Sequence, residues 1–189
     1  MSEKVIQIGN EQITLRRAQS LEEVLQVQEL DTLTWPEGYK HYKDLFDLDP
    51  YSIFVAVNQA GKVVSHVGVE RINQSDLGIG MPPWDHDPRA NWHKPNGDTW
   101  YITGHVVDNA YRKCGLSHEM ISYLKEIASD YYTRFIAVIH RLNHPTLGKV
   151  SEFWKHHGFV RLDQTLDPNW KAAPTAEGSG GVIYSLRIN

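Results

Sequence analysis

The sequence predicts an α/β (α+β) domain in which helices flank a mixed, mainly antiparallel central sheet. Two β-hairpin patterns occur early in the chain, and alternating strand and helix patterns occupy its second half. Hairpins place antiparallel strands side by side, whereas a strand–helix–strand unit makes a parallel pair. The length of 189 residues, with 41% hydrophobic and 22% charged residues, suits one globular domain spanning residues 1–189.

The first half of the chain holds both hairpin patterns. Gly9 and Gly61 each lie between two β-type runs, as expected of hairpin turns. Ser20 and Glu23 have the spacing of a capping box, and apolar residues in helical spacing follow them. The expected elements are a hairpin at 4–17, a helix at 20–31, a short helix at 39–47, and strands at 52–58 and 62–72.

A long inserted loop at 73–98, rich in Pro and Gly, precedes the second half. After it, apolar residues recur at the spacing of a helix face, beginning with Leu116, Met120 and Leu124. Gly158 suits the residue that follows the end of a helix. The expected elements are strands at 99–108, 135–139, 159–163 and 182–188, helices from 116 and at 146–157, and a linker at 167–181.

Charge and composition exclude several classes of function. The chain has 19 basic and 23 acidic residues, a net charge of −4, so we expect no nucleic-acid partner. No apolar run approaches about 20 residues, so we expect no membrane span, and a single Cys suits a cytoplasmic protein. His118 and Glu119 begin a zinc-protease motif, but Ser122 replaces its second His, so we expect no metal.

The most informative segment, V-D-N-A-Y-R-K-C-G-L-S from Val107 to Ser117, joins a predicted strand to the strongest predicted helix. An Arg and a Gly at the start of a helix favour an anion site, because unpaired backbone N–H groups there can hold a phosphate. Val107, Arg112 and Gly115 resemble motif A of the GNAT acetyltransferase superfamily, V-x-x-x-x-R/Q-x-x-G-x-G/A, with Ser117 at the last position. The segment F-W-K-H-H-G-F at 153–159 is similar to that family's F-Y-x-x-x-G-F signature.

This resemblance implies acetyl-CoA, or another acyl-CoA, as donor. The pantetheine arm would pair with the strand edge at Val106 and Val107 and contact Asn143, and backbone amides around 105–107 would stabilise an oxyanion. The residues implied to bind the pyrophosphate are Arg112, Lys113, Cys114, Gly115, Leu116 and Ser117. The activity implied is N-acetyl transfer to an amine by direct attack in a ternary complex.

The catalytic residues are predicted from strand alternation combined with the resemblance. Alternation along the strand predicts that one face carries Tyr101, Thr103, His105 and Val107. The opposite face then carries Trp100, Ile102, Gly104 and Val106. Relatives often carry a catalytic Glu or His on the face of Val107, so we expect His105 to be the base and Tyr101 the weaker candidate. An ordinary His pKa near 6.5 suits proton acceptance at neutral pH.

Trp154 stands where relatives have a tyrosine thought to protonate the leaving thiolate, and an indole cannot deliver a proton at neutral pH. Three interpretations of Trp154 therefore stay open: the enzyme needs no acid there, another group serves, or the chain is an acyl-CoA-binding or sensing module without activity. A separate alternative is an unrelated domain with a chance motif. Cys114, near a helix N-terminus, could also be a nucleophile, although no base for it is evident.

The acceptor is left undefined as a small-molecule or peptide amine, and a homodimer is a possible assembly. Four aromatic residues are predicted either to contact the acceptor or to close the edge of the core: Trp35, Tyr39, Trp84 and Trp92. The 73–98 loop carries two of them, so we expect it to reach the acceptor side of the site.

Overall fold

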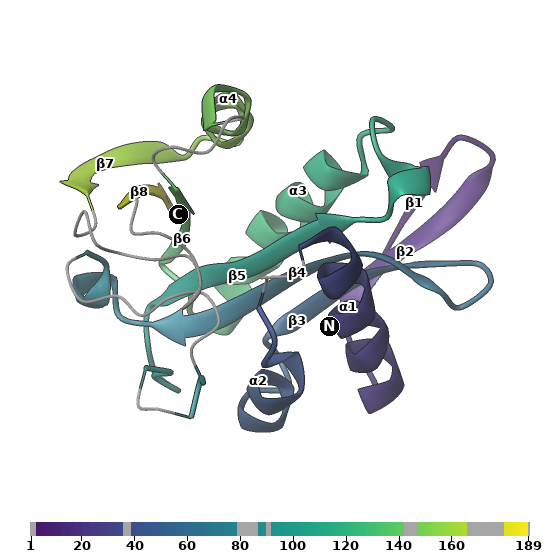
Figure 1. Ribbon diagram of the computed structural model, residues 1–189, viewed down its shortest axis with the longest axis horizontal. Coiled ribbons are helices and arrows are strands. Elements are labelled where there is room, and N and C mark those ends of the chain that lie inside the picture. The colour runs from purple at the N-terminus through teal and green to yellow at the C-terminus, as the bar shows by residue number, and fades with distance from the viewer. Residues whose placement is uncertain are drawn as a thin grey trace.

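The computed structural model contains one eight-stranded mixed sheet with helices on both faces (Figure 1). It describes residues 3–35, 39–78, 87–89, 92–141, 147–165 and 180–188. The strands are β1 (Lys4–Ile8), β2 (Glu11–Arg17), β3 (Ile53–Asn58), β4 (Val63–Ile72), β5 (Thr99–Val107), β6 (Phe135–Arg141), β7 (Val160–Thr165) and β8 (Gly181–Arg187). The α-helices of the described part are α1 (Leu21–Thr34), α2 (Tyr42–Leu48), α3 (Leu116–Ala128) and α4 (Leu147–His156).

The strands follow the order β1-β2-β3-β4-β5-β6-β8-β7, and every neighbouring pair is antiparallel except β5 with β6. The predicted fold class is therefore confirmed. The early hairpins make the antiparallel part of the sheet. The β5-α3-β6 unit makes its single parallel pair, because the helix carries the chain back to the start of the next strand.

The two largest hydrophobic clusters of the described residues lie on opposite faces of the sheet. On one face α3 packs through buried residues that include Leu116, Met120 and Leu124 against strand residues such as Trp100. On the other face α1 and α2 pack against Val55 and its neighbours. In Figure 1, α4 lies near the end of the sheet formed by β6, β8 and β7, away from α1.

Two elements end later in the structure than the sequence predicts, and backbone hydrogen bonds explain both differences. The capping residue Ser20 accepts a hydrogen bond from the backbone N–H of Glu23 as expected, at 3.3 Å. Helix α1 then continues to Thr34 rather than residue 31, because the N–H of Trp35 still bonds to the carbonyl of Asp31 at 2.7 Å. Strand β6 runs to Arg141 because its pairing with β8 continues to Gly181.

The long loop and the linker are described only in part. Of the 73–98 loop the structure describes 73–78, 87–89 and 92–98, and it includes a short 3-10 turn at Gln74–Asp76. The predicted 167–181 linker lies mostly outside the described residues. None of the described helices is long and apolar enough to cross a membrane.

Candidate functional site

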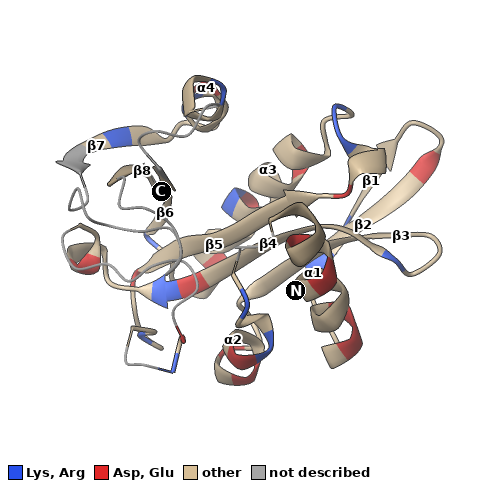
Figure 2. Ribbon diagram, viewed as in Figure 1, with Lys and Arg blue, Asp and Glu red and all other residues tan. Residues whose placement is uncertain are grey.

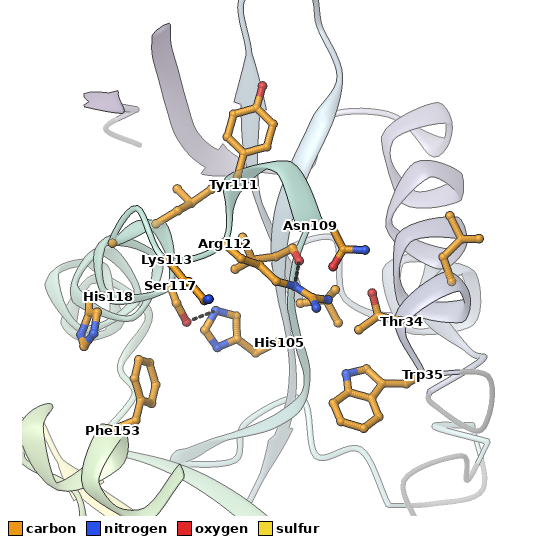
Figure 3. Close-up of a pocket in the computed structure, with 15 residues that line it drawn as sticks. Thr34, Trp35, His105, Asn109, Tyr111, Arg112, Lys113, Ser117, His118 and Phe153 are labelled. Atoms are coloured by element: carbon orange, nitrogen blue, oxygen red, sulfur yellow. Dashed lines mark hydrogen bonds between the residues drawn. The ribbon is translucent and has the colours of Figure 1, made fainter. Parts of the chain in front are cut away.

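A cleft of about 580 Å³ opens where β5 ends, between α1 and α3 (Figure 3). Its walls are the last turn of α1, the end of β5, the loop at 109–115, the first turn of α3 and Phe153 of α4. Most of the residues that the sequence singles out line it: Trp35, His105, Val106, Val107, Arg112, Lys113, Gly115, Leu116 and Ser117. The fold thus gathers the strand end and the loop into one site.

The parallel pair of strands separates beside this cleft. Strand β5 pairs with β6 only from Thr99 to Tyr101, opposite Phe135 to Ala137, and no further β5–β6 pair forms among the described residues. The later residues of β5 keep their pairing with β4 on the other side. The edge of β5 that faces β6 can therefore pair with an extended ligand at the level of the predicted pantetheine contacts.

A β-bulge at Thr103 changes the faces that strand alternation predicts. Gly68 pairs with Gly104, but the next residue, Val69, pairs with Ile102, so Thr103 is an additional residue in β5. Before the bulge, Ile102 faces α3, whereas Val106 after it faces α1 and α2. The prediction that these two share a face is wrong, because one inserted residue reverses the alternation.

The bulge separates the two predicted catalytic residues. His105 faces α3, where its Nε2 lies 3.3 Å from the Ser117 hydroxyl (Figure 3). Tyr101 lies on the opposite face, buried in a cluster with Ile72 and Ala137, and it does not line the cleft. The predicted common face of His105 and Tyr101 is therefore wrong, and only His105 reaches the site.

The loop between β5 and α3 presents backbone N–H groups and positive charge to the cleft. Gly115 is the N-cap of α3 with φ 88°, and no side chain caps the helix. The first-turn N–H groups at Leu116 and Ser117 therefore lack intrahelical partners. Arg112 and Lys113 are exposed beside them, and Arg112 Nε donates to the Val107 carbonyl at 3.1 Å, which joins the loop to the strand end. Together these groups suit an anion such as a pyrophosphate.

Charge is distributed unevenly around this site. Figure 2 marks acidic residues on α1 and residues of both signs on α2 and in the loop between β5 and α3. The acidic residue of that loop, Asp108, forms an ion pair with Lys62 at 2.7 Å. No Asp or Glu is among the described residues that line the cleft. An anionic ligand there meets cations and helix dipole without a carboxylate to repel it.

His105 is neutral at physiological pH. Its pKa is lowered to about 3, first because burial penalises the imidazolium form and then because His66, His157, His118 and His140 lie near it. The ring still borders the cleft and packs against Phe153, with ring centroids 6.2 Å apart. A neutral imidazole can orient an attacking amine through a hydrogen bond, but it is a much weaker base than its ordinary pKa suggests.

The predicted acceptor-contacting aromatics do not form one group. Trp35 lines the cleft and is half exposed. Tyr39 is buried between α1 and α2, with its ring 5.0 Å from that of Tyr42, and Trp92 packs beside the cluster that holds Tyr101. Trp84 lies outside the described residues, as does the predicted pantetheine contact Asn143.

Cys114 is exposed within the same loop. Its thiol donates to the Tyr111 carbonyl at 2.7 Å, which favours a role in the loop's own conformation. The geometry adds no support for a nucleophile. Among the described residues, three side chains that could ligate a metal converge only at His41, Asp44 and Asp87, outside the cleft, and Arg89 already forms ion pairs with both carboxylates.

Two histidines outside the set of predicted site residues, His118 and His157, join α3 to α4. His118 lines the cleft, and its Nδ1 lies 3.0 Å from Nε2 of His157. The pKa of His157 is lowered to about 4, first by burial and then by His118. His157 belongs to the F-W-K-H-H-G-F segment, which is the sequence signal that could have indicated a partner for His118. The two residues are 39 positions apart, so only the fold reveals that they pair.

Trp154 and His140 form a second contact that the sequence did not reveal. Trp154 is buried, and its indole Nε1 donates to Nε2 of His140 at 2.6 Å. His140 belongs to the part of β6 that has separated from β5. Trp154, which stands where the resemblance leads us to expect a tyrosine, thus donates a hydrogen bond to His140 beside the place where β5 and β6 separate.

A mixed sheet whose central parallel pair separates beside an uncapped helix N-terminus defines the class of GNAT-type acetyltransferase folds. The Acetyltransferase (GNAT) family model matches residues 19–159, and the chain belongs to this family. A search among curated proteins finds no significant match.

Solved structures share the fold at low sequence identity. The GphF GNAT-like decarboxylase in complex with isobutyryl-CoA is 15% identical, with a TM-score of 0.74 over 93% of this chain and 99% of that one. Arabidopsis thaliana Naa50 in complex with the bisubstrate analogue CoA-Ac-MVNAL is 17% identical, with a TM-score of 0.61 over 92% and 97%. The ribosomal-protein-S18-alanine N-acetyltransferase of Escherichia coli is 12% identical, with a TM-score of 0.62 over 94% of each chain.

Proposed function

We propose that this protein is an N-acyltransferase that moves an acetyl group from acetyl-CoA to an amine by direct attack in a ternary complex. The observation that carries the proposal is the opening between β5 and β6 beside the loop at 112–117. An extended arm fits the unpaired strand edge, and a pyrophosphate fits the helix N-terminus next to it. The similar structures that contain isobutyryl-CoA and a CoA-based bisubstrate analogue support an acyl-CoA as the ligand of this fold.

In this proposal the chain's own groups divide the work between donor and acceptor. Arg112, Lys113 and the N–H groups of the loop bind the pyrophosphate, and the β5 edge at Val106 and Val107 holds the pantetheine. Backbone N–H groups around 105–107 stabilise the oxyanion that forms when the amine attacks the thioester carbon. The new N–C bond replaces the C–S bond, and CoA leaves as the thiolate.

His105 orients the amine rather than serving as a strong base, because its pKa of about 3 leaves it neutral and weakly basic. Trp35, half exposed at the rim, contacts the acceptor. The acceptor is a small-molecule or peptide amine.

Acetyl-CoA binding is tested first, through the stability of the folded protein. At about 100 Kd the ligand should raise the free energy of unfolding by about 2.7 kcal/mol, or roughly 5–10 °C in Tm for a domain of this size. Gly115→Glu should abolish that gain, because a bulky carboxylate then occupies the phosphate site.

Gly61→Glu is a matched control for this variant. Gly61 and Gly115 have similar positive φ values, 79° and 88°, and a Cβ at either would meet no atom within 4 Å. Both substitutions therefore carry the same charge and backbone strain, but Gly61 lies in the β3–β4 turn, outside the cleft. An equal ligand-induced shift in both variants would contradict the site. Release of CoA thiol in the presence of amino acids, polyamines, aminoglycosides and peptides then tests transfer and identifies the acceptor.

A second candidate function is an acyl-CoA reaction that needs no base. The cleft contains no carboxylate among its described residues, and its histidine at 105 is a weak base. Loss of CO2 from a malonyl-type thioester requires no proton removal from an acceptor, and one similar structure is named a GNAT-like decarboxylase. Release of CO2 from malonyl-CoA without amine-dependent thiol release would favour this function. Binding without either reaction would favour a sensing module.

A further inference from the structure

The contact between Trp154 and His140 determines which nitrogen of His140 carries a proton. Trp154 is 3% exposed, and its Nε1 can only donate a hydrogen bond. Nε2 of His140, 2.6 Å away, must therefore accept it and cannot itself be protonated. The proton of the ring is then on Nδ1, and the ring is neutral, because a doubly protonated imidazole has no lone pair to accept with.

The register of the sheet puts His140 level with His105, where β5 and β6 have separated. Ala137 is the last residue of β6 paired with β5, opposite Tyr101, and His140 follows it by three residues. On β5 the bulge adds one residue, so the corresponding position is His105, four residues after Tyr101. Parallel strands rise by nearly equal distances per residue. The two histidines therefore stand on opposite sides of the opening.

Both histidines also face the same side of the sheet. His105 contacts Ser117 of α3 and Phe153 of α4, while His140 contacts Trp154 of α4. His140 is only partly buried, as a residue that meets a ligand must be.

We propose that His140, held by Trp154 as the neutral tautomer protonated at Nδ1, donates a hydrogen bond to the sulfur of the departing CoA thiolate. This inference rests on the proposed transferase function and assigns a donor at the leaving group, where Trp154 cannot act. As the amine nitrogen bonds to the carbonyl carbon, the C–S bond breaks and its electron pair stays on sulfur. The Nδ1–H stabilises that charge without being transferred. The amine proton passes to solvent, and the thiolate takes its proton from solvent after release. The N–H dipole of a neutral imidazole stabilises the charge that develops on sulfur without any change in the protonation of the ring.

The tautomer is measured directly by long-range ¹H–¹⁵N NMR on the full chain labelled at histidine nitrogens. We expect the His140 signals, assigned by their loss in His140→Phe, to show a protonated Nδ1 and an unprotonated Nε2. In Trp154→Phe the ring loses its donor, and the tautomer should move toward protonated Nε2. A His140 that is protonated at Nε2 in the unmodified protein would overturn the proposal, whatever the activity.

Kinetics test the function of that proton. With acetyl-CoA and the amine found by the thiol-release panel, His140→Phe should lower kcat by about 10²–10³-fold, with the KM for acetyl-CoA unchanged. Trp154→Phe should lower kcat less, because His140 remains but its tautomer is no longer fixed. Trp154→Tyr in the His140→Phe background should restore part of kcat, because a phenol then stands where the family has one.

His156→Phe is the matched control, an exposed histidine of α4 whose ring contacts His118 and His157 rather than Trp154. Unchanged kcat in His140→Phe, or an equal loss in His156→Phe, would overturn the role of His140 while leaving acyl transfer intact. Acetyl-CoA should also perturb the His140 signals in the unmodified protein but not in Gly115→Glu. Failure of every amine to release thiol would instead contradict the transferase function, and the tautomer measurement would still stand by itself.

Discussion

Gly104→Ala tests the packing that holds the bulge of β5 in place. Gly104 and its cross-strand partner Gly68 together accommodate the ring of Tyr42 from α2. A Cβ on Gly104 would overlap the Tyr42 hydroxyl and lie 3.3 Å from Cζ and 3.4 Å from an Asp31 carboxylate oxygen. Tyr42 is fully buried and donates to that carboxylate at 3.3 Å, so it has no open space into which to move.

The expected loss of stability has two parts. Overpacking a well-filled core costs about 1–3 kcal/mol. Displacing the Tyr42 hydroxyl from the buried Asp31 carboxylate adds about 1–3 kcal/mol, because the acceptor then lacks its donor. A total of roughly 2–6 kcal/mol corresponds to a decrease in Tm of about 4–24 °C for a domain of this length.

Urea unfolding of a small set of variants measures this loss. Gly148→Ala is the control, because a Cβ at that helical position meets nothing within 4 Å, and it should leave stability unchanged or slightly higher. Tyr42→Phe removes the overlapping oxygen, so the double variant with Gly104→Ala should be more stable than Gly104→Ala alone. If Gly104→Ala unfolds within about 0.5 kcal/mol of the unmodified protein, the argument from close packing is refuted.

Three further predictions concern the site and its surroundings. His105→Ala should lower kcat by about 10²–10³-fold, while acetyl-CoA should still raise the Tm of the variant. Because the pKa of His105 is about 3, any acidic limb of the kcat/KM profile above pH 5 should stay in place. Loss of that limb in the variant would contradict a neutral His105. The pKa of His157 is about 4 in the folded protein and near 6.5 in the unfolded chain, so its contribution to stability is complete above pH 6.5 and lost as the pH falls toward 4. His157→Gln should therefore flatten the decline in urea stability across that window, and parallel curves would refute the assignment. Shortening the 73–98 loop should raise the KM for the amine while acetyl-CoA binding stays intact; loss of acetyl-CoA binding in a folded variant would count against an acceptor role.

Local patterns predict most of the fold because they depend on neighbouring residues. The turn at Gly9, the cap at Ser20 and the apolar face of α3 each occur where the sequence indicates them. The loop at the start of α3, which we propose binds phosphate, is found from the sequence for the same reason, since its Arg, its Gly and the start of the helix lie within eleven consecutive residues.

Contacts between distant segments could not be predicted in this way. The bulge at Thr103 depends on which residue of β4 pairs with which residue of β5. The alternation of side chains within one strand does not determine this pairing, so the sequence of β5 alone could not predict the bulge. Gly68 and Gly104 hint at a close approach, but their common partner Tyr42 belongs to another element. The bond from Trp154 to His140 likewise joins a helix to a strand, and no spacing rule connects them.

The separation of β5 from β6 divides the sheet into two blocks joined by a short seam. Strands β1–β5 form one block and β6–β8 the other, and in the described part of the chain the strand pairing between them is limited to the three pairs from Thr99 to Tyr101. A ligand arm bonded along β5 would lie between the blocks as a ninth strand that the chain itself does not encode. Acyl-CoA would then serve as a structural component as well as a substrate. Amide hydrogen exchange beyond the seam, in β6 and β8 as well as in β5, should slow when the ligand binds, even at residues that it does not touch.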